Sequence, residues 1–434
     1  MRKALHYNPD NVEQFIKKAL HFSQRYDYCS YFSANNIANI PYQGFKNLLA
    51  FNATQIIPFK SSDPFLDLQQ FQEIHKDWLI GHFGYDLKNN IEKLSSSNTD
   101  RLNFPDIFFY QPETVILWDD KNISIETYNS DPQSIIKNIE AIAPHSTSLL
   151  EPINEIYAGT SREEYIGKVK KLKQHIVEGD IYEINYCIDF HTNTKDFSPL
   201  HAYELLTTTS PTPFSVFHKF NNYYLICASP ERFMKKEGQK LVSQPIKGTA
   251  KRGSNKTEDD FIKKSLRKDV KELAENMMIV DLVRNDLAKS SQYGTIKPEE
   301  LFGIYSFHQL HQMISTITST LSPEVTAIEA IKNAFPMGSM TGAPKIKVME
   351  LIEKYENNKR GLYSGAMGYF SPTGDFDFNV VIRSILYNAS NSTLSFQVGS
   401  AITYDAIPEK EYEECLLKAK AILELLGNPT IKVK

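Results

Sequence analysis

The stretch GDIYEINYCIDF, residues 179–190, alternates between apolar and polar or small residues. The apolar set is Tyr182, Ile184, Tyr186, Ile188 and Phe190, and the other set is Glu183, Asn185, Cys187 and Asp189. Because successive side chains of a strand point to opposite faces, this alternation predicts a half-buried β-strand. A polar face of this kind lies against either solvent or a pocket, and here we expect solvent.

The residues before this strand predict an α-helix. Ser161 and Glu164 form an S-x-x-E capping box, which satisfies unpaired N–H groups at a helix start. Apolar residues then recur on one helical face, at Tyr165, Val169, Leu172 and Ile176. Gly179 follows as the expected left-handed residue beyond the helix C-terminus.

Further helices and strands are expected downstream. One long helix should start at Thr257 and carry an apolar stripe through Leu266, Val270, Leu273, Met277 and Val280. The last helix should begin near Pro408, a favourable first residue, and run towards Gly427. Strand-like runs occupy residues 114–118, 224–229, 363–370, 378–386 and 393–403. The mixture predicts an α+β fold with mainly antiparallel strand neighbours.

Composition excludes several classes of protein. The 434 residues hold 48 Lys+Arg against 52 Asp+Glu, a net charge of −4, which argues against a nucleic-acid partner. No run of about 18 apolar residues occurs, so no membrane span is expected. The N-terminus has no apolar stretch typical of a secretory signal. The four cysteines are widely spaced without a CxxC, which indicates reduced thiols and a cytoplasmic protein.

The chain is expected to have two regions. Residues 1–145 hold few signals of chemistry, whereas residues 155–434 hold nearly all of them. The segment 143–148 breaks the periodicity between two ordered parts and is the expected boundary.

Two pairs of glutamates could hold a cation. Glu272 and Glu275 are three residues apart on one expected helix, and Glu411 and Glu414 are three apart on the last one. Residues at i and i+3 share a helical face, so two converging faces would suit Mg²⁺, which prefers oxygen ligands. The alternative is a solvated face on which Lys418 pairs with Glu414.

Lys247 and Glu231 are candidates for covalent and acid–base chemistry. Lys247 lies in Gln244-Pro245-Ile246-Lys247-Gly248-Thr249, where proline and glycine indicate a turn. A lysine is a nucleophile only as the free amine, and most lysines are simply solvated. Glu231 ends an apolar strand and could act as a general acid or base, or could pair with Arg232 at the surface.

The loop GSMTGAPK, residues 338–345, resembles a phosphate loop only at first sight. It lacks the G-x-x-x-x-G-K-[ST] spacing, and Pro344 has no N–H to donate, so no nucleotide site is expected. A glycine-rich loop before a helix can still bind a carboxylate, which makes Ser339 and Thr341 candidate binding residues.

Seven motifs in series resemble the chorismate-utilising enzymes, the family of anthranilate, aminodeoxychorismate, isochorismate and salicylate synthases. They are GDIYEINY (179–186), SPERF (229–233), PIKGT (245–249), ELAENMMIVDLVRNDL (272–287), GSMTGAPK (338–345), RGLYSGAMGYFSPTGDFDFNVVIRS (360–384) and EYEECLLKA (411–419). The N-terminal third is similar only through GHFGYDLKN (81–89). The resemblance implies the anthranilate synthase component I type of α+β fold, a sheet-rich two-layer core with flanking helices and a central cleft.

The lysine of PIKGT resembles the aminodeoxychorismate synthase branch, since anthranilate synthases carry alanine there. The resemblance implies that Lys247 attacks C2 of chorismate, that Glu231 protonates the departing C4 hydroxyl, and that ammonia displaces the lysine in p-aminobenzoate and folate synthesis. It further implies Mg²⁺ on Glu275 and Glu414, supported by Glu272 and Glu411. The implied substrate-binding residues are Tyr363 and Arg383, with Gly248, Thr249, Gly399, Ser400, Ala401 and Lys418.

Some positions depart from the family pattern. Glu183 stands where the family usually has glutamine, and Gly399-Ser400-Ala401 stands where it has three glycines. Gln312 takes the place of a histidine, and no tryptophan-binding LLES motif is visible. No cysteine lies in a G-x-C-x-G glutaminase setting, so ammonia must come from solution or from a separate glutamine amidotransferase subunit. Anthranilate, isochorismate or salicylate synthesis, or a non-catalytic chorismate-binding subunit, are the alternatives.

Overall fold

The computed structural model describes residues 2–37, 39–143, 150–308 and 310–433. Its helices are α1 (Val12–Ser23), α2 (Pro64–His75), α3 (Lys88–Ile91), α4 (Pro132–Glu140), α5 (Arg162–Val177), α6 (Pro199–Thr209), α7 (Lys256–Leu266), α8 (Val270–Ala288), α9 (Ala327–Ala334), α10 (Lys345–Tyr355) and α11 (Pro408–Leu425). The short 3₁₀ helices are η1 (Tyr85–Leu87) and η2 (Gly338–Met340).

One continuous hydrogen-bonded sheet connects the strands of the described residues. The strands are β1 (Lys3–Tyr7), β2 (Tyr28–Ser33), β3 (Leu48–Ile56), β4 (Leu79–Phe83), β5 (Ile107–Trp118), β6 (Ile123–Thr127), β7 (Glu155–Ala158), β8 (Glu183–Asn193), β9 (Phe214–Phe220), β10 (Tyr223–Ser229), β11 (Arg232–Glu237), β12 (Lys240–Gln244), β13 (Ile246–Lys251), β14 (Lys297–Ser306), β15 (Leu310–Thr320), β16 (Gly342–Ala343), β17 (Ala366–Phe370), β18 (Phe376–Val380), β19 (Ser384–Asn388), β20 (Thr393–Ile402) and β21 (Thr430–Val433). Strand neighbours are antiparallel apart from β7 and β21, as the sequence predicted.

The sheet folds into two layers that share β5. One layer continues from β5 through β3, β2, β9, β10, β19, β20 and β8. The other continues through β4, β17, β18, β11, β12 and β15 to β13 and β14. One hydrophobic core takes buried side chains from both layers, among them Val216, Leu225, Met367 and Phe378. The α+β two-layer core is therefore confirmed.

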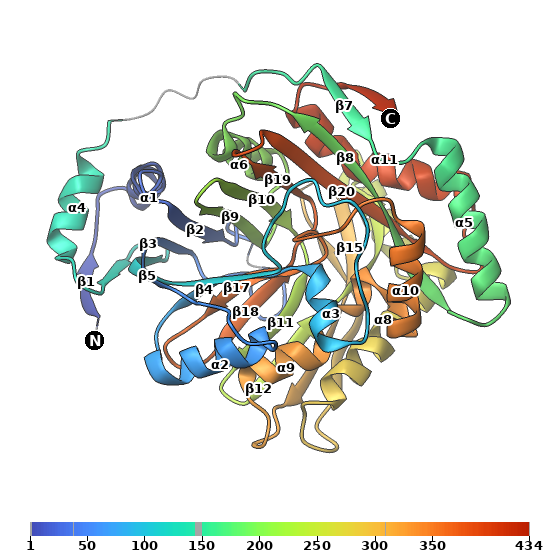
Figure 1. Ribbon diagram of the computed structural model, residues 1–434, viewed down its shortest axis with the longest axis horizontal. Coiled ribbons are helices and arrows are strands. Elements are labelled where there is room, and N and C mark those ends of the chain that lie inside the picture. The colour runs from blue at the N-terminus through green and yellow to red at the C-terminus, as the bar shows by residue number, and fades with distance from the viewer. Residues whose placement is uncertain (1, 38, 144–149, 309, 434) are drawn as a thin grey trace.

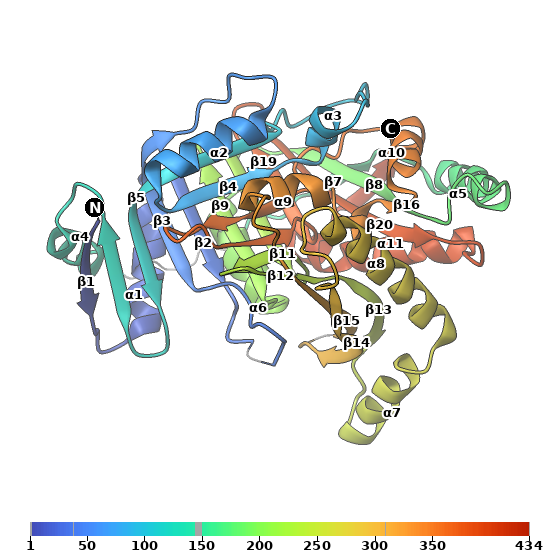
Figure 2. The same ribbon diagram turned by 90° about the horizontal axis from the view of Figure 1, so that it is seen from below.

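The helices cover the outer faces of these layers. A second core joins α1, α4, α5, α6, α10 and α11 to the outer face of the first layer, while α8 packs on β13 and β15 and contacts α9. Helices α5 and α11 lie side by side at one end of the molecule, and β1 and α4 lie at the other (Figure 1). Helix α7 projects away from the body (Figure 2).

Strands of the N-terminal region pair directly with strands of the C-terminal region, β2 with β9 and β4 with β17. The expected boundary at 143–148 lies, apart from Ala143, outside the described residues. No helix among residues 2–433, gaps aside, combines the length and apolarity needed to cross a membrane.

Several local predictions were correct, and others were wrong. Ser161 caps α5 by accepting the Glu164 N–H, and Gly179 has φ +83°, as expected. The single helix expected from Thr257 is two helices: α7 ends at Leu266 with Arg267 as its C-cap, and Asp269 caps the start of α8 by accepting the Glu272 N–H at 3.1 Å. Strand β8 is buried on both faces, so its polar side chains do not face solvent. Lys247 of the second layer contacts Glu183, and Tyr363 and Asn358 from the segment before β17 contact Cys187 and Asp189. This burial is a tertiary effect that strand periodicity does not report.

Candidate functional site

Glu231 and Arg383 lie at two corners, the connections where the chain passes from one layer to the other. Glu231 lies between β10 in the first layer and β11 in the second, and Arg383 lies between β18 and β19. The corners hold each other, because the Val380 N–H donates to Glu231 O at 3.0 Å and the Ala228 N–H donates to Arg383 O at 3.1 Å. Arg383 has φ +50°, which turns the chain and splits the run expected as one strand over 378–386.

Arg383 is a partly buried cation that forms no ion pair at contact distance with the described residues. Of the residues that the structure describes, none forms an ion pair or hydrogen bond with its guanidinium group. Burial lowers its pKa to about 10, and only the charge of Glu231 opposes that shift. A desolvated guanidinium fits a bound carboxylate, which it can hold through two parallel hydrogen bonds.

Glu231 is only 5% exposed, so it is not a surface partner of Arg232, which pairs with Asp377 instead. Burial raises the pKa of Glu231 to about 7, although Ser339, Lys247 and the backbone of Ile246 act in the opposite direction. A carboxyl group with this pKa can donate a proton near neutral pH.

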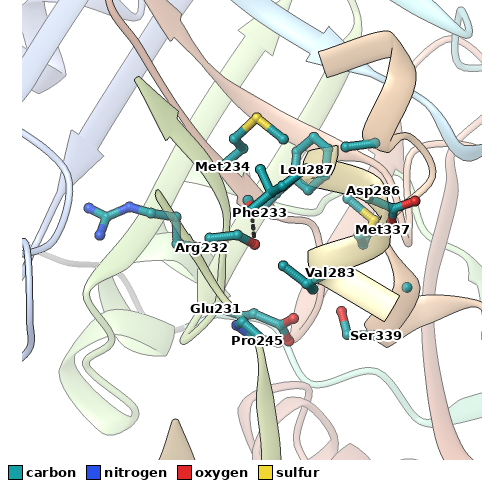
Figure 3. Close-up of a pocket in the computed structure, with 13 residues that line it drawn as sticks. Glu231, Arg232, Phe233, Met234, Pro245, Val283, Asp286, Leu287, Met337 and Ser339 are labelled. Carbon is teal, nitrogen blue, oxygen red and sulfur yellow. Dashed lines mark hydrogen bonds between the residues drawn. The ribbon is translucent and has the colours of Figure 1, made fainter. Parts of the chain in front are cut away.

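Glu231 borders a hollow of about 330 Å³, a volume that includes space open to solvent. Figure 3 shows the Glu231 carboxyl and the Ser339 hydroxyl on one side of it, while Arg232 points away. Val283 and Met337 contribute apolar wall, and the buried Ser339 hydroxyl has no hydrogen-bond partner among the described residues. The binding role of Ser339 stays a prediction.

Lys247 points inward, between the layers. Its Nζ donates to Glu183 Oε1 at 2.7 Å, and the two side chains are 12% and 2% exposed. Burial lowers the pKa of Lys247, but Glu183, Glu275 and Glu231 together raise it by more. In this arrangement Lys247 is an ammonium ion, whereas the sequence analysis required the free amine.

The turn after Lys247 packs closely on α8. Gly248 has φ +99°, and a Cβ there would lie 3.1 Å from Glu272 Oε2, so glycine suits this position. Asn276 on α8 donates to the Lys247 carbonyl oxygen at 3.0 Å, and this bond fixes the turn against the helix. Thr249 pairs with Gln312 across β13 and β15.

The four glutamates converge around Lys271. Lys271 Nζ lies 3.5 Å from Glu275 Oε1 and 3.9 Å from Glu411 Oε1, which joins α8 to α11. Burial and neighbouring carboxylates raise the pKa of Glu272 to about 7 and also raise those of Glu275 and Glu411. Burial acts the same way on Glu414, but Lys418 lowers its pKa overall.

This donor set fits a hard divalent cation. All four donors are carboxylates, and the buried Oε1 of Glu275 accepts no hydrogen bond among the described residues. As placed, no three of these glutamates bring their oxygens within 4.8 Å of one another in the described part of the chain. Lys271 lies between them, a role that the sequence analysis missed.

Lys418 holds two predicted site residues together. Its Nζ lies 2.7 Å from Glu414 Oε1 and donates to Gly399 O at 2.8 Å. Thus the ion pair between Glu414 and Lys418 forms, and the two glutamate pairs also converge. A Cβ on Gly399 would lie 2.6 Å from Cys187 Sγ, so this glycine allows close strand packing.

Other predicted binding side chains are engaged elsewhere. The Ser400 hydroxyl bonds the Tyr165 hydroxyl at 2.9 Å, and Thr341 Oγ1 donates to Met337 O at 3.1 Å. The Thr341 backbone is engaged as well, because its N–H donates to Gly338 O and its carbonyl oxygen accepts the Asn185 N–H. Ala401 pairs with Asn185 on β8. Tyr363 is buried, and its hydroxyl lies 3.9 Å from Cys187 Sγ.

The chain belongs to the chorismate binding enzyme family, whose model matches residues 23–424. It is 35% identical over 357 residues to an anthranilate synthase component I-like protein of Synechocystis, covering 81% of this chain and 73% of that protein. It is 32% identical to aminodeoxychorismate synthase component 1 of Bacillus subtilis, covering 80% of this chain and 76% of that one. The crystal structure of anthranilate synthase component I from Streptococcus pneumoniae matches with a TM-score of 0.77 at 27% identity, over 88% of this chain and 93% of that chain. The protein is thus a chorismate-utilising enzyme.

Proposed function

We propose that this protein aminates chorismate to 4-amino-4-deoxychorismate, in p-aminobenzoate and folate synthesis. The observation that supports it most is the buried amine of Lys247 beside Glu231, whose pKa lies at about 7. A nucleophile and a general acid that act on the same substrate allow a difficult displacement to proceed in two easier steps.

In the proposed reaction, Lys247 as the free amine attacks C2 of the ring. Electron pairs move through the conjugated ring, the C4–O bond breaks, and Glu231 supplies the proton that releases water. Ammonia then adds at C4, and the reverse shift of electron pairs breaks the bond to Lys247.

Arg383 is proposed to bind the enolpyruvyl carboxylate of the substrate, because its guanidinium group has no partner of its own. Tyr363 is proposed to line the same side. Backbone groups of Gly248, Gly399 and Ala401 would complete the pocket.

Glu275 and Glu414, with Glu272 and Glu411, are proposed to hold Mg²⁺. When bound, the ion would neutralise and orient the ring carboxylate of chorismate. Lys271 must leave the space between Glu275 and Glu411 for the ion to reach both.

Ammonia is proposed to come from a separate glutamine amidotransferase subunit, or from solution. The four cysteines, which are all buried and free, support a reducing compartment such as the cytoplasm.

A product assay tests the proposal. The chain alone, with chorismate, Mg²⁺ and ammonium salt, is expected to form 4-amino-4-deoxychorismate, which chromatography with mass detection separates from anthranilate and isochorismate. Lys247→Ala should abolish it. Anthranilate as the main product would instead support the activity named for the relatives of the anthranilate synthase type.

A further inference from the structure

We infer that Glu183 is the base that takes the proton from Lys247 before the amine attacks, and the acid that returns it when the amine leaves. This inference rests on the proposed function and adds a third reacting side chain to Lys247 and Glu231.

Contact and burial carry the inference. Glu183 Oε1 lies 2.7 Å from Lys247 Nζ, which is hydrogen-bond distance, and Glu183 is 2% exposed. The nucleophile therefore already has a proton acceptor in contact with it. A proton can move between them without reaching bulk water.

The backbone holds Glu183 in place. Glu183 begins β8 and pairs with Ala343 of β16, within the GSMTGAPK loop. A Cβ on Gly342 would lie 2.1 Å from the Glu183 carbonyl oxygen, so only glycine permits this approach. The GSMTGAPK loop thus positions Glu183.

The other acidic groups around Lys247 have other roles. Lys247 also interacts electrostatically with three other carboxylates: Glu231 between β10 and β11, Glu275 on α8 and Glu414 on α11. Of the residues that the structure describes, Glu183 is the one that forms an ion pair and a side-chain hydrogen bond with Lys247 Nζ. Glu231 must keep its proton for the hydroxyl, and Glu275 belongs to the proposed cation site.

The proton balance closes over one turnover. Glu183 takes a proton from the Lys247 ammonium, the amine bonds to C2, and Glu231 gives its proton to the departing C4 hydroxyl as water leaves. After ammonia adds at C4, Lys247 departs as a neutral amine. The new C4 ammonium returns a proton to Glu231, and Glu183 returns its proton to Lys247, so chorismate and ammonia become the amine and water.

A charge anchor is the alternative role for Glu183, and it predicts the opposite result. If Glu183 only stabilised the ammonium ion, its neutral isostere would leave more free amine and would speed the attack. If Glu183 is the base, Glu183→Gln slows the attack, because the proton must reach solvent.

The experiment measures the covalent step without ammonia. Wild type and Glu183→Gln are mixed with chorismate and Mg²⁺, quenched over time, and the Lys247 adduct is quantified by peptide mass spectrometry. We expect adduct formation in Glu183→Gln to be about a hundredfold slower. Below about pH 7, where Glu231 keeps its proton, the variant's rate should rise about tenfold per pH unit while that of wild type stays nearly level.

Glu178→Gln is the matched control. It removes the same charge from an exposed residue just before β8, whose carboxylate accepts from Gln174, and it should react like wild type. Adduct formation by Glu183→Gln at the wild-type rate or faster would overturn the inference. If Glu183→Gln does not fold, Glu183→Asp and Glu183→Asn provide the same comparison, and equal rates for that pair would overturn it as well.

The two proposals fail in different ways. No Lys247 adduct in wild type, with anthranilate as the product, would reject the proposed function. A wild-type adduct that forms equally fast without the Glu183 carboxylate would reject only the role of Glu183.

Discussion

Glu356 and Arg360 form a buried bidentate ion pair, with Arg360 Nη2 2.6 Å from Glu356 Oε1 and Nε 2.9 Å from Oε2. Both side chains are under 5% exposed. The pair also binds the backbone of the site, because Glu356 accepts the Cys187 N–H and Arg360 donates to Asn185 O and Met340 O. It therefore joins β8 to the loop that carries Ser339.

Glu356→Ala should destabilise the protein by about 3–5 kcal/mol, because it leaves the Arg360 charge buried and unpaired. Urea unfolding followed by circular dichroism measures the loss. Glu350→Ala on α10 is the control, since Glu350 and Lys347 form a half-exposed pair that contributes under about 1 kcal/mol. Equal losses in the two variants would contradict the assigned role of the buried pair.

The elements that the sequence predicted well are those with local signals. Helix α5 begins at its Ser161 cap, and α11 begins at Pro408 and ends before Gly427, which has φ +89°. Capping and backbone conformation act within a few residues, so no tertiary information was needed.

The errors arose where the second layer decides the outcome. Periodicity predicts that the polar face of β8 is exposed to solvent, yet Glu183 on that face forms an ion pair with Lys247 of the distant strand β13. Likewise, nothing local to 378–386 shows that Arg383 turns the chain between layers. Local patterns already made the two glutamate pairs, Lys247 and Glu231 candidate site residues, and the family resemblance suggested their roles. The contacts of Glu183 and Lys271 required coordinates.

The pKa of Glu231, at about 7, should appear in the pH dependence of turnover. Because a general acid must be protonated, kcat/KM should fall as pH rises through about 7. Glu231→Gln should lower kcat about 10²–10⁴-fold and remove that descending limb. Glu237→Gln, which alters an exposed carboxylate paired with Lys235 at the end of β11, should keep the wild-type profile.

Arg383→Lys should raise KM for chorismate at least tenfold, with kcat changed much less. Lysine keeps the charge but loses the two-pronged geometry, at a cost of about 1.5–3 kcal/mol for a charged hydrogen bond. Steady-state kinetics and calorimetric titration with chorismate measure the effect. Arg284→Lys is the control, because Arg284 forms an exposed pair with Asp281 on α8, and it should leave both constants unchanged. An unchanged KM in Arg383→Lys would show that Arg383 does not bind the carboxylate.

The acidic cluster should control the response to divalent cations. Removal of Mg²⁺ with a chelator should stop chorismate turnover, and Glu275→Gln should raise the half-saturating Mg²⁺ concentration about 10–100-fold. Glu413→Gln, at an exposed position of α11, should not change it.

Lys271→Met should act in the opposite direction and tighten the binding of Mn²⁺, because it removes a positive charge from between Glu275 and Glu411. Electron paramagnetic resonance without substrate measures this binding. Weaker Mn²⁺ binding in Lys271→Met would show that the cation does not enter the space where Lys271 lies.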